Sequence, residues 1–284
     1  MVRKKIVFII SLLFILPFVA NAQIIGFRLA ANSGVLLTEF GSADVPIYPE
    51  QNPAQSTERF SPQPTIGFEG EILFQVSPNS FFGIEGDYTH LKGVNDNPPN
   101  YNYFYTPYFQ NFQDELYLSP IKYNTHLWNL AVNYKYFFFE EKVFQPFIKL
   151  TGVVSFVGTE MSYKDMPDAS LESDILYARG TSNSDQKKWP VFHVGGGVGF
   201  SYDLTDHMAF QVDGTATVIN SGIVNGVPNF TYVQENGEDL LRYNRRLSLT
   251  MQISVGLVYT FEIERGGSGE GQTSPELPFY RRKK

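Results

Sequence analysis

The stretch LSLTMQISVGLVYTF at residues 247–261 alternates, along most of its length, between apolar side chains and polar or small ones. The apolar row is Leu247, Leu249, Met251, Ile253, Val255, Leu257, Tyr259 and Phe261, and it is opposed by Ser248, Thr250, Gln252, Ser254 and Thr260. Because successive side chains of a β-strand point to opposite faces, this period of two predicts a strand with one apolar face. An apolar row of this length leaves little polar surface to meet water, which favours a strand that faces lipid.

Seven other segments repeat the same alternation. They are residues 24–37, 64–76, 81–92, 121–138, 144–157, 190–204 and 208–219. Transmembrane β-barrels are built from alternating segments of about ten residues separated by turns. No apolar stretch after Val19 approaches the roughly 20 residues that a helical span needs. The sequence therefore predicts eight strands, an even number.

The connections between these segments alternate in length. The long ones are 38–63, 93–120, 158–189 and 220–244, and the short ones are 77–80, 139–143 and 205–207. Outer-membrane barrels have this pattern, with tight periplasmic turns at one end and larger loops outside. We therefore predict an all-β fold, an eight-stranded antiparallel up-and-down transmembrane β-barrel over residues 23–262. A soluble barrel with its apolar rows turned inward is the alternative that the sequence leaves open.

Both ends of the chain carry segments that lie outside the predicted barrel. Residues 1–22 have the basic start, apolar middle and small-residue end of a secretion signal, with cleavage between Ala22 and Gln23. We therefore expect the bacterial outer membrane, with both termini of the barrel in the periplasm. Residues 263–284 begin with a glycine-rich linker and predict a flexible periplasmic tail. A short docking peptide anchored by Leu277, Phe279 and Tyr280 is the alternative for this tail.

Composition excludes several classes of function. The chain has no cysteine, which rules out disulfides, thiolate metal sites and a cysteine nucleophile. Loss of the three positive charges of the signal would take the net charge from −7 to about −10, which disfavours binding to nucleic acid. The four histidines lack metal-ligand spacing, and the glycine-rich stretch 195–199 has no following helix to hold a phosphate. We expect no cofactor and no metal.

The predicted inward rows contain an unusual number of charges. They include Arg28, Glu69, Glu71, Glu85, Asp87, Lys135, Lys149 and Asp213, together with His193. An eight-stranded barrel is only wide enough inside to be filled by side chains, and buried carboxylates need partners. A tight turn at 77–79 would set Glu71 opposite Glu85. We predict a salt-bridged, closed lumen at mid-barrel, with a narrow ion channel and a catalytic carboxylate cluster as alternatives.

Aromatic side chains gather near the predicted short turns. We expect them to form a girdle at the periplasmic membrane interface. The expected set is Phe81, Phe82, Tyr136, Phe137, Phe138, Phe139, Tyr202, Tyr259 and Phe261.

The second long connection is rich in aromatic rings, and loops on a rigid scaffold often carry recognition. Its candidate recognition residues are Tyr101, Tyr103, Phe104, Tyr105, Tyr108, Phe109 and Phe112. The alternative is that these rings pack over the barrel mouth or lie at lipid headgroups. The expected partners are outer-membrane lipid and lipopolysaccharide, and a protein bound through the loops or the tail.

An enzyme is the competing class of function. Barrel enzymes that hydrolyse lipid A or peptides need a serine or a carboxylate beside a histidine. His90 and His126 flank the second long connection, where Asp96, Asp114, Glu115 and Ser119 could approach them. No spacing defines such a site, so we expect a structural or interaction role without enzymatic activity.

Three features resemble a known group of proteins. They are the secretion signal before Gln23, the opening strand GFRLAAN at 26–32, and the closing strand VGLVYTF at 255–261. They resemble the small outer-membrane β-barrel proteins of Bacteroidota, often called PorT-like, which are similar in architecture to the OmpA membrane domain. The resemblance implies an outer-membrane location and an accessory role in type IX secretion or envelope assembly. The chain departs from the usual C-terminal insertion signal because residues 262–284 follow Phe261.

Overall fold

The computed structural model describes residues 24–40, 60–96, 104–105, 120–139, 143–165, 174–178, 187–221, 230–235, 238–243 and 247–262. The expected signal peptide, its cleavage site at Ala22 and Gln23, and the expected tail lie outside these residues. No helix in the described part of the chain is long and apolar enough to cross a membrane.

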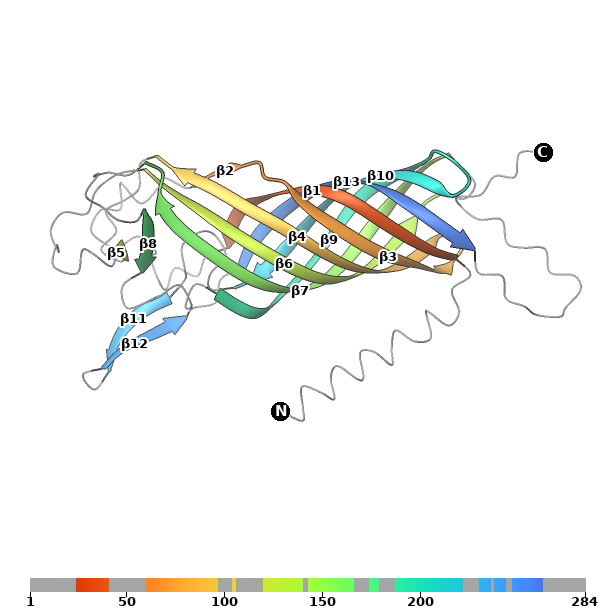
Figure 1. Ribbon diagram of the computed structural model, residues 1–284. Helices are drawn as coiled ribbons and strands as arrows, with labels where there is room; N and C mark the ends of the chain where they lie inside the picture. Colours follow the sequence, from red (N-terminus) through yellow and green to blue (C-terminus); the bar gives the residue numbers. More distant parts are fainter. Residues whose placement is uncertain are drawn as a thin grey trace, which may run out of the picture.

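Within the described residues, eight long antiparallel strands form a closed ring (Figure 1). They are β1 (Ile24–Phe40), β3 (Gly67–Ser77), β4 (Ser80–Asn95), β6 (Ile121–Phe137), β7 (Phe144–Tyr163), β9 (Lys187–Asp203), β10 (Met208–Asn220) and β13 (Leu247–Glu262). The ring closes because β1 pairs with β3 on one side and with β13 on the other. The predicted fold class is confirmed.

The two faces of each strand differ as the alternation predicts. Outward residues such as Leu29, Ile66 and Val198 are 74%, 83% and 67% exposed, whereas the charged residues of the inward rows are buried. The soluble alternative with inward apolar rows is therefore wrong. Phe74 shares the outward face by register but is only 7% exposed.

The two ends of the barrel differ in their connections (Figure 1). We call the end at which short turns join β3 to β4 and β9 to β10 the turn end, and the opposite end the loop end. At the turn end, Thr205 starts a tight turn in which its hydroxyl accepts a hydrogen bond from the Met208 amide at 3.0 Å. Ile24 pairs with Glu262, so the first and last described residues also lie there.

The loop end contains five short strands that the sequence did not predict. They are β2 (Ser61–Gln63), β5 (Phe104–Tyr105), β8 (Ile175–Ala178), β11 (Phe230–Glu235) and β12 (Glu238–Tyr243). Strand β2 pairs with β4, and β8 pairs with both β7 and β5, so these three extend the barrel wall. Strands β11 and β12 form a separate hairpin.

The lumen near the turn end is filled by an apolar plug, which we define as Leu73, Phe81, Phe137, Phe147, Ala209 and Val258. The ring centroids of Phe81 and Phe137 lie 5.5 Å apart, and those of Phe137 and Phe147 lie 5.1 Å apart. The expectation that Phe81 and Phe137 belong to the outer girdle is wrong. The two residues share the odd positions of β4 and β6 with Glu85 and Lys135, so the strand period turns them inward.

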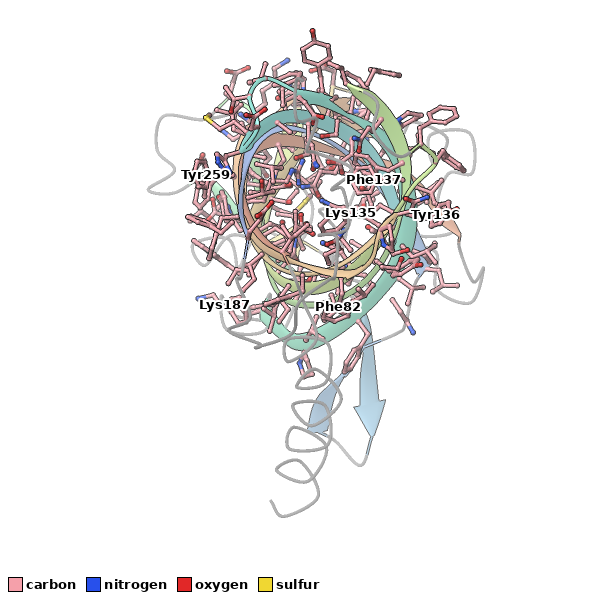
Figure 2. All side chains as sticks on the ribbon, turned by 90° about the vertical axis from the view of Figure 1, so that its right-hand side faces the viewer. Phe82, Lys135, Tyr136, Phe137, Lys187 and Tyr259 are labelled. Carbon is pink, nitrogen blue, oxygen red and sulfur yellow. The ribbon has the colours of Figure 1, made fainter. Side chains whose placement is uncertain are left out.

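The other members of the expected girdle lie on the outer surface. Phe138, Tyr259 and Phe261 are 50%, 42% and 47% exposed. Viewed from the turn end, Lys135 and Phe137 point into the barrel while Phe82, Tyr136 and Tyr259 lie outside it (Figure 2).

A second outward aromatic set, not predicted from the sequence, lies closer to the loop end. It consists of Phe68, Tyr88, Trp128, Phe156 and Phe192. The rings of Tyr88 and Trp128 are 4.7 Å apart, and those of Phe68 and Tyr88 are 5.4 Å apart. Between Trp128 and Tyr134, the outward residues of β6 are Leu130 and Val132. The apolar band of the wall is therefore bounded by aromatic rings on both sides.

Replacing Phe137 with alanine should lower the free energy of unfolding by about 3–5 kcal/mol, because it opens a cavity among packed rings. Phe138→Ala is the matched control, since it removes the same side chain from an exposed neighbouring position and should cost less. Guanidinium unfolding in detergent micelles, followed by tryptophan fluorescence, measures both values. Equal losses would contradict the inward placement of Phe137.

Candidate functional site

The candidate site is a layer of charged side chains inside the barrel. Its members are Arg28, Glu69, Glu71, Glu85, Asp87, Lys135, Lys149 and Asp213, and each is at most 8% exposed. Strand pairing brings them together, because Glu71 lies opposite both Arg28 and Glu85, and Glu69 lies opposite Asp87. The register that the tight turn at 77–79 predicts is therefore observed. We call these eight residues the charged layer.

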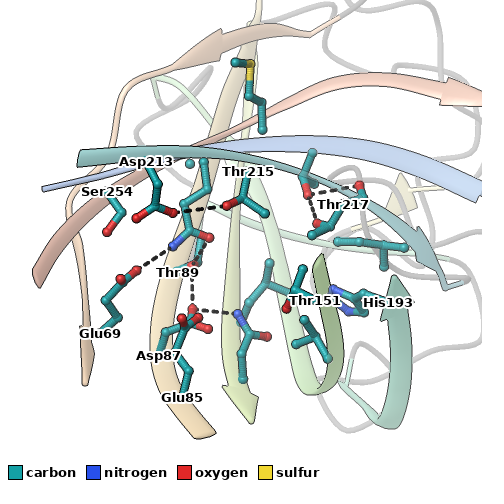
Figure 3. Close-up of a pocket in the computed structure, with 18 of the residues that line it drawn as sticks. Glu69, Glu85, Asp87, Thr89, Thr151, His193, Asp213, Thr215, Thr217 and Ser254 are labelled. Carbon is teal, nitrogen blue, oxygen red and sulfur yellow. Dashed lines mark hydrogen bonds between the residues drawn. The ribbon is translucent and has the colours of Figure 1, made fainter. Parts of the chain in front are cut away.

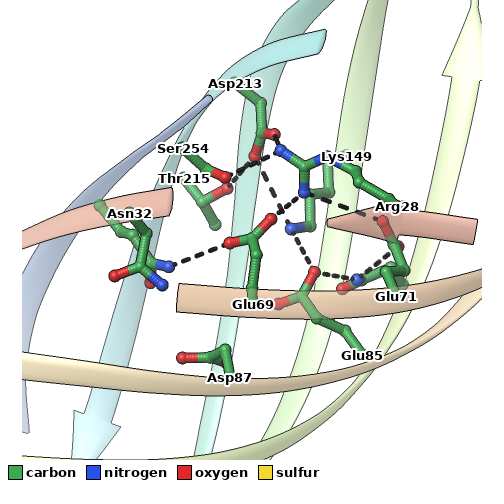
Figure 4. A network of polar contacts seen from close by, with 12 residues as sticks. Arg28, Asn32, Glu69, Glu71, Glu85, Asp87, Lys149, Asp213, Thr215 and Ser254 are labelled. Carbon is green, nitrogen blue, oxygen red and sulfur yellow. Dashed lines mark hydrogen bonds and ion pairs between the residues drawn. The ribbon is translucent and has the colours of Figure 1, made fainter. Parts of the chain in front are cut away.

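Arg28 on β1 binds acids on both sides of its own strand, one on β3 and one on β10 (Figure 4). Its guanidinium pairs with the Glu69 carboxylate through Nη1 and with Asp213 Oδ2 at 2.6 Å through Nη2. The Nη2 atom also donates a hydrogen bond to Ser254 Oγ at 2.8 Å. A planar guanidinium presents its donors in a fixed fork, so it can bind two carboxylates in a defined geometry. Arg28 therefore holds β1, β3 and β10 in one arrangement.

The two lysines of the charged layer continue the network around the lumen. Lys135 Nζ lies 2.5 Å from Glu71 Oε2, and Lys149 Nζ lies 3.0 Å from Glu85 Oε2 and 3.7 Å from Asp213 Oδ1. Each of these three ion pairs joins strands that are separated by one other strand in the ring. The pairs therefore brace the barrel across its interior, in addition to the hydrogen bonds of the wall.

A neutral amide, which the sequence analysis missed, links the two acidic strands. Asn133 Nδ2 donates hydrogen bonds to Glu71 Oε1 at 2.8 Å and to Glu85 Oε2 at 2.7 Å. Asn133 precedes Lys135 by two positions and so shares its inward face. This parity was the signal that could have identified it. The amide separates two carboxylates that would otherwise repel each other.

Asp87 differs from the other acids because it has no ion pair within the described residues. Its Oδ1 atom accepts hydrogen bonds from Thr89 Oγ1 at 2.8 Å and Asn129 Nδ2 at 2.7 Å. Both donors are neutral, so neither of them supplies a positive charge to the carboxylate.

A small cavity lies beside the charged layer, on its loop-end side (Figure 3). Its volume is about 30 Å³, which is enough for one or two water molecules. Glu69, Glu85, Asp87, Lys149 and Asp213 line it together with His193 and several threonines. The His193 Nε2 atom is buried and has no hydrogen-bond partner in the described structure.

Further toward the loop end, the lumen becomes apolar again. Its buried inward residues there include Leu91, Tyr123, Leu127, Val157, Met161 and Ile219. The sequence analysis treated the inward rows as polar and missed this second apolar layer. Continuing the parity of each strand toward the loop end would have found it. The charged layer therefore lies between two apolar layers of the lumen.

The histidines considered for an enzyme lie on the outside of the barrel wall. His90 and His126 are opposite each other on β4 and β6, and their rings stack with centroids 4.7 Å apart. The Tyr88 hydroxyl lies 2.6 Å from His126 Nδ1, while Asp96 pairs with Lys164 at 2.7 Å. Asp114, Glu115 and Ser119 lie outside the described residues. In the described ranges, no three His, Asp or Glu side chains converge as metal ligands would.

The roots of the second and third long loops are tied to each other. The Asp96 carboxylate accepts a hydrogen bond from Lys164 and raises the pKa of that lysine. Lys122 pairs with Asp174 at 3.8 Å, and the Tyr163 amide donates to the Asp174 carbonyl at 2.9 Å.

Only two of the seven candidate recognition residues in the second loop lie in the described part of the chain. Phe104 and Tyr105 form β5, in which Phe104 lies opposite Ala178 and Tyr105 lies opposite Tyr177. Tyr101, Tyr103, Tyr108, Phe109 and Phe112 lie outside the described residues. The described part of the aromatic loop is therefore attached to the third loop by strand pairing.

Neither a protein-family model nor a curated protein sequence matches the chain. Among solved structures, it is similar to the outer membrane protein OprG from Pseudomonas aeruginosa, with a TM-score of 0.41 and 10% identity over 85% of this chain and 97% of that one. It is also similar to the outer membrane protease OmpT from Escherichia coli, with a TM-score of 0.39 and 12% identity over 85% and 98% of the two chains. Ail of Yersinia pestis, an attachment invasion locus protein, matches with a TM-score of 0.37 and 9% identity over 84% and 99%. Similarity at this level carries no argument about function.

The pair of Lys135 and Glu71 should be strongly coupled energetically. Lys135→Met and Glu71→Gln should each lower the free energy of unfolding by about 3–5 kcal/mol, because each removes one member of a buried ion pair. The double variant should lose much less than the sum of the two. Guanidinium unfolding of the four proteins in micelles measures this coupling.

Lys122→Met is the control for this cycle, because Lys122 pairs with Asp174 at the exposed loop end. It should change the free energy of unfolding by less than about 1 kcal/mol. Additive losses from Lys135→Met and Glu71→Gln would contradict a buried pair.

Proposed function

We propose that the chain is a non-enzymatic outer-membrane barrel with a closed lumen, whose long loops carry an interaction function. The observation that supports it best is the outward apolar band between two sets of aromatic rings, around a lumen that contains the charged layer between two apolar layers. Aromatic girdles at both interfaces and a polar interior are features of outer-membrane barrels.

The dimensions of the apolar band support this placement. On β6 the outward residues run from Tyr136 to Trp128. At about 3.3 Å per residue and a tilt near 40°, this distance is about 20 Å along the membrane normal, close to the usual band of about 25 Å. Beyond Trp128, the outward residues His126, Asn124 and Lys122 are polar or ionisable, as expected at lipid headgroups.

The orientation follows from the connections. Short turns of outer-membrane barrels face the periplasm and long loops face outside. In our proposal the turn end is periplasmic, so Ile24 and Glu262 lie on the periplasmic side. The four long loops then meet the exterior, where the expected partners are lipopolysaccharide and a protein or glycan.

The filled lumen supports an interaction role over transport. The apolar plug, the charged layer and the second apolar layer occupy the interior in succession, and the cavity beside the charged layer has a volume of about 30 Å³. The outward position of His90 and His126 supports a role without catalysis, because no described serine or carboxylate contacts them. An accessory role in type IX secretion or envelope assembly is the function that the resemblance to PorT-like proteins favours.

Spin labels on single cysteines should test which face of the wall meets lipid, since the chain has no cysteine of its own. Leu130 is 58% exposed, so a spin label attached at Leu130→Cys should collide readily with oxygen dissolved in the bilayer. A label at Ala131→Cys should be shielded from oxygen and from a water-soluble nickel complex. Electron paramagnetic resonance in reconstituted vesicles measures these collisions, and a nickel-accessible label at Leu130→Cys would overturn the placement.

Replacing Tyr101, Tyr103, Tyr108, Phe109 and Phe112 with serine should remove a partner protein that is recovered with the wild type. The aromatic rings supply contact area that serine lacks, whereas the barrel and β5 are retained. Purification of intact outer-membrane complexes, followed by quantitative mass spectrometry, measures the loss. Replacing residues 222–229 of the fourth loop with a Gly-Ser linker is the control, and equal recovery from all three proteins would contradict the aromatic loop as the binding face.

A further inference from the structure

The charged layer is not balanced. It contains the five carboxylates Glu69, Glu71, Glu85, Asp87 and Asp213 but only the three cations Arg28, Lys135 and Lys149. Burying an ionised carboxylate without a partner is costly. The layer therefore requires either bound protons or additional positive charge.

Of the five carboxylates, Asp87 is the one that has no ion pair within the described residues. It is 8% exposed, and the two side chains that donate hydrogen bonds to it in the described structure, Thr89 and Asn129, are neutral. The inward neighbours toward the loop end, such as Thr215 and Gln252, are also neutral. The uncompensated charge is thus on the side of the layer that borders the cavity (Figure 3).

A second observation, independent of the charge imbalance, indicates that an ion or a water molecule fills the cavity. His193 lines it and is 4% exposed, yet its Nε2 atom has no hydrogen-bond partner in the described structure. A buried ring nitrogen without a partner is rare unless an ion or a water molecule fills the space beside it. Threonine and Ser254 hydroxyls, carboxylates and the amides of Asn129 and Gln252 also line the cavity, together with the Lys149 ammonium. Oxygen atoms are the ligands that hard cations prefer.

We propose that this cavity binds one small monovalent cation beside Asp87. The volume of about 30 Å³ excludes organic amines and leaves room for an ion with at most one water molecule. A divalent ion fits less well, because the described structure gathers no three acidic or histidine ligands and Lys149 lines the same cavity. The cation supplies one of the two missing charges and satisfies the polar groups around it.

The two apolar layers on either side make this an occluded site. Phe81 and Phe137 of the apolar plug lie toward the turn end, and Leu91 and Ile219 lie toward the loop end, each at most 1% exposed. The cation therefore acts as an internal structural charge of the barrel. This role goes beyond the proposed interaction function and does not depend on the loops.

The test uses the full chain refolded in detergent micelles with sodium, potassium, ammonium or N-methyl-D-glucamine chloride at one ionic strength. N-methyl-D-glucammonium is too large for the cavity. At least one small cation should raise the melting temperature by about 5–10 °C at about 100 times its dissociation constant, relative to the large cation. Circular dichroism measures the melting temperature, and sodium-23 relaxation with potassium or ammonium competition measures occupancy directly.

Asp87→Asn should abolish this dependence on the cation, because it removes the negative charge while keeping the hydrogen-bonding shape. Asp96→Asn, which changes an exposed acid at the loop end, should retain it. Equal melting temperatures in all four salts would overturn the proposal in favour of water or a proton in the cavity. A dependence that survives Asp87→Asn would overturn it in favour of adventitious surface binding. If Asp87→Asn does not fold, the wild type still decides: unperturbed sodium-23 relaxation together with equal melting temperatures in sodium, potassium and ammonium chloride overturns the site.

Discussion

Closure of the sheet is the constraint on which the rest of this structure depends. Once β1 pairs with both β3 and β13, every side chain of a ring strand points either into the lumen or away from it. An eight-stranded lumen is too narrow to remain a water-filled pore, so its inward residues must pack against one another. Each inward row therefore behaves like a protein core, while each outward row behaves like a surface in contact with lipid.

This constraint explains why charged residues can occupy the core. A buried ion pair gains little over well-packed apolar side chains, because desolvation offsets the attraction between the charges. A buried ion pair has a larger effect on the arrangement of the strands than on the free energy of unfolding. Lys135 and Glu71 join β6 to β3 across β4, and Arg28 and Asp213 join β1 to β10 across β13. A shift of one residue in any of these strands would turn a charge outward, so we infer that the network helps to select the strand register.

The sequence predicted the fold because a period of two is a local property that each strand displays by itself. The same parity placed Arg28, Lys135 and the acids inside the barrel. It failed for Phe81 and Phe137, because their aromatic identity was given more weight than their position in the strand. Alternation also places Asn133 in the lumen, but which acids its amide contacts, such as Glu71, depends on side-chain reach and is not predictable from alternation. The short strands β5 and β8 pair two loops through backbone groups, and their residues carry no alternation long enough to detect.

The layers also place different constraints on the inward and the outward rows of the barrel. The inward rows are constrained by the apolar plug, by the charged layer and by the second apolar layer, so most substitutions there disturb packing or pairing. The outward rows are constrained only to remain apolar or aromatic. The roots of the second and third long loops are held together by Lys164 with Asp96 and by Lys122 with Asp174. Because these anchors lie at the loop end of the ring strands, the aromatic loop of our proposal can vary in sequence while its attachment to the barrel is kept.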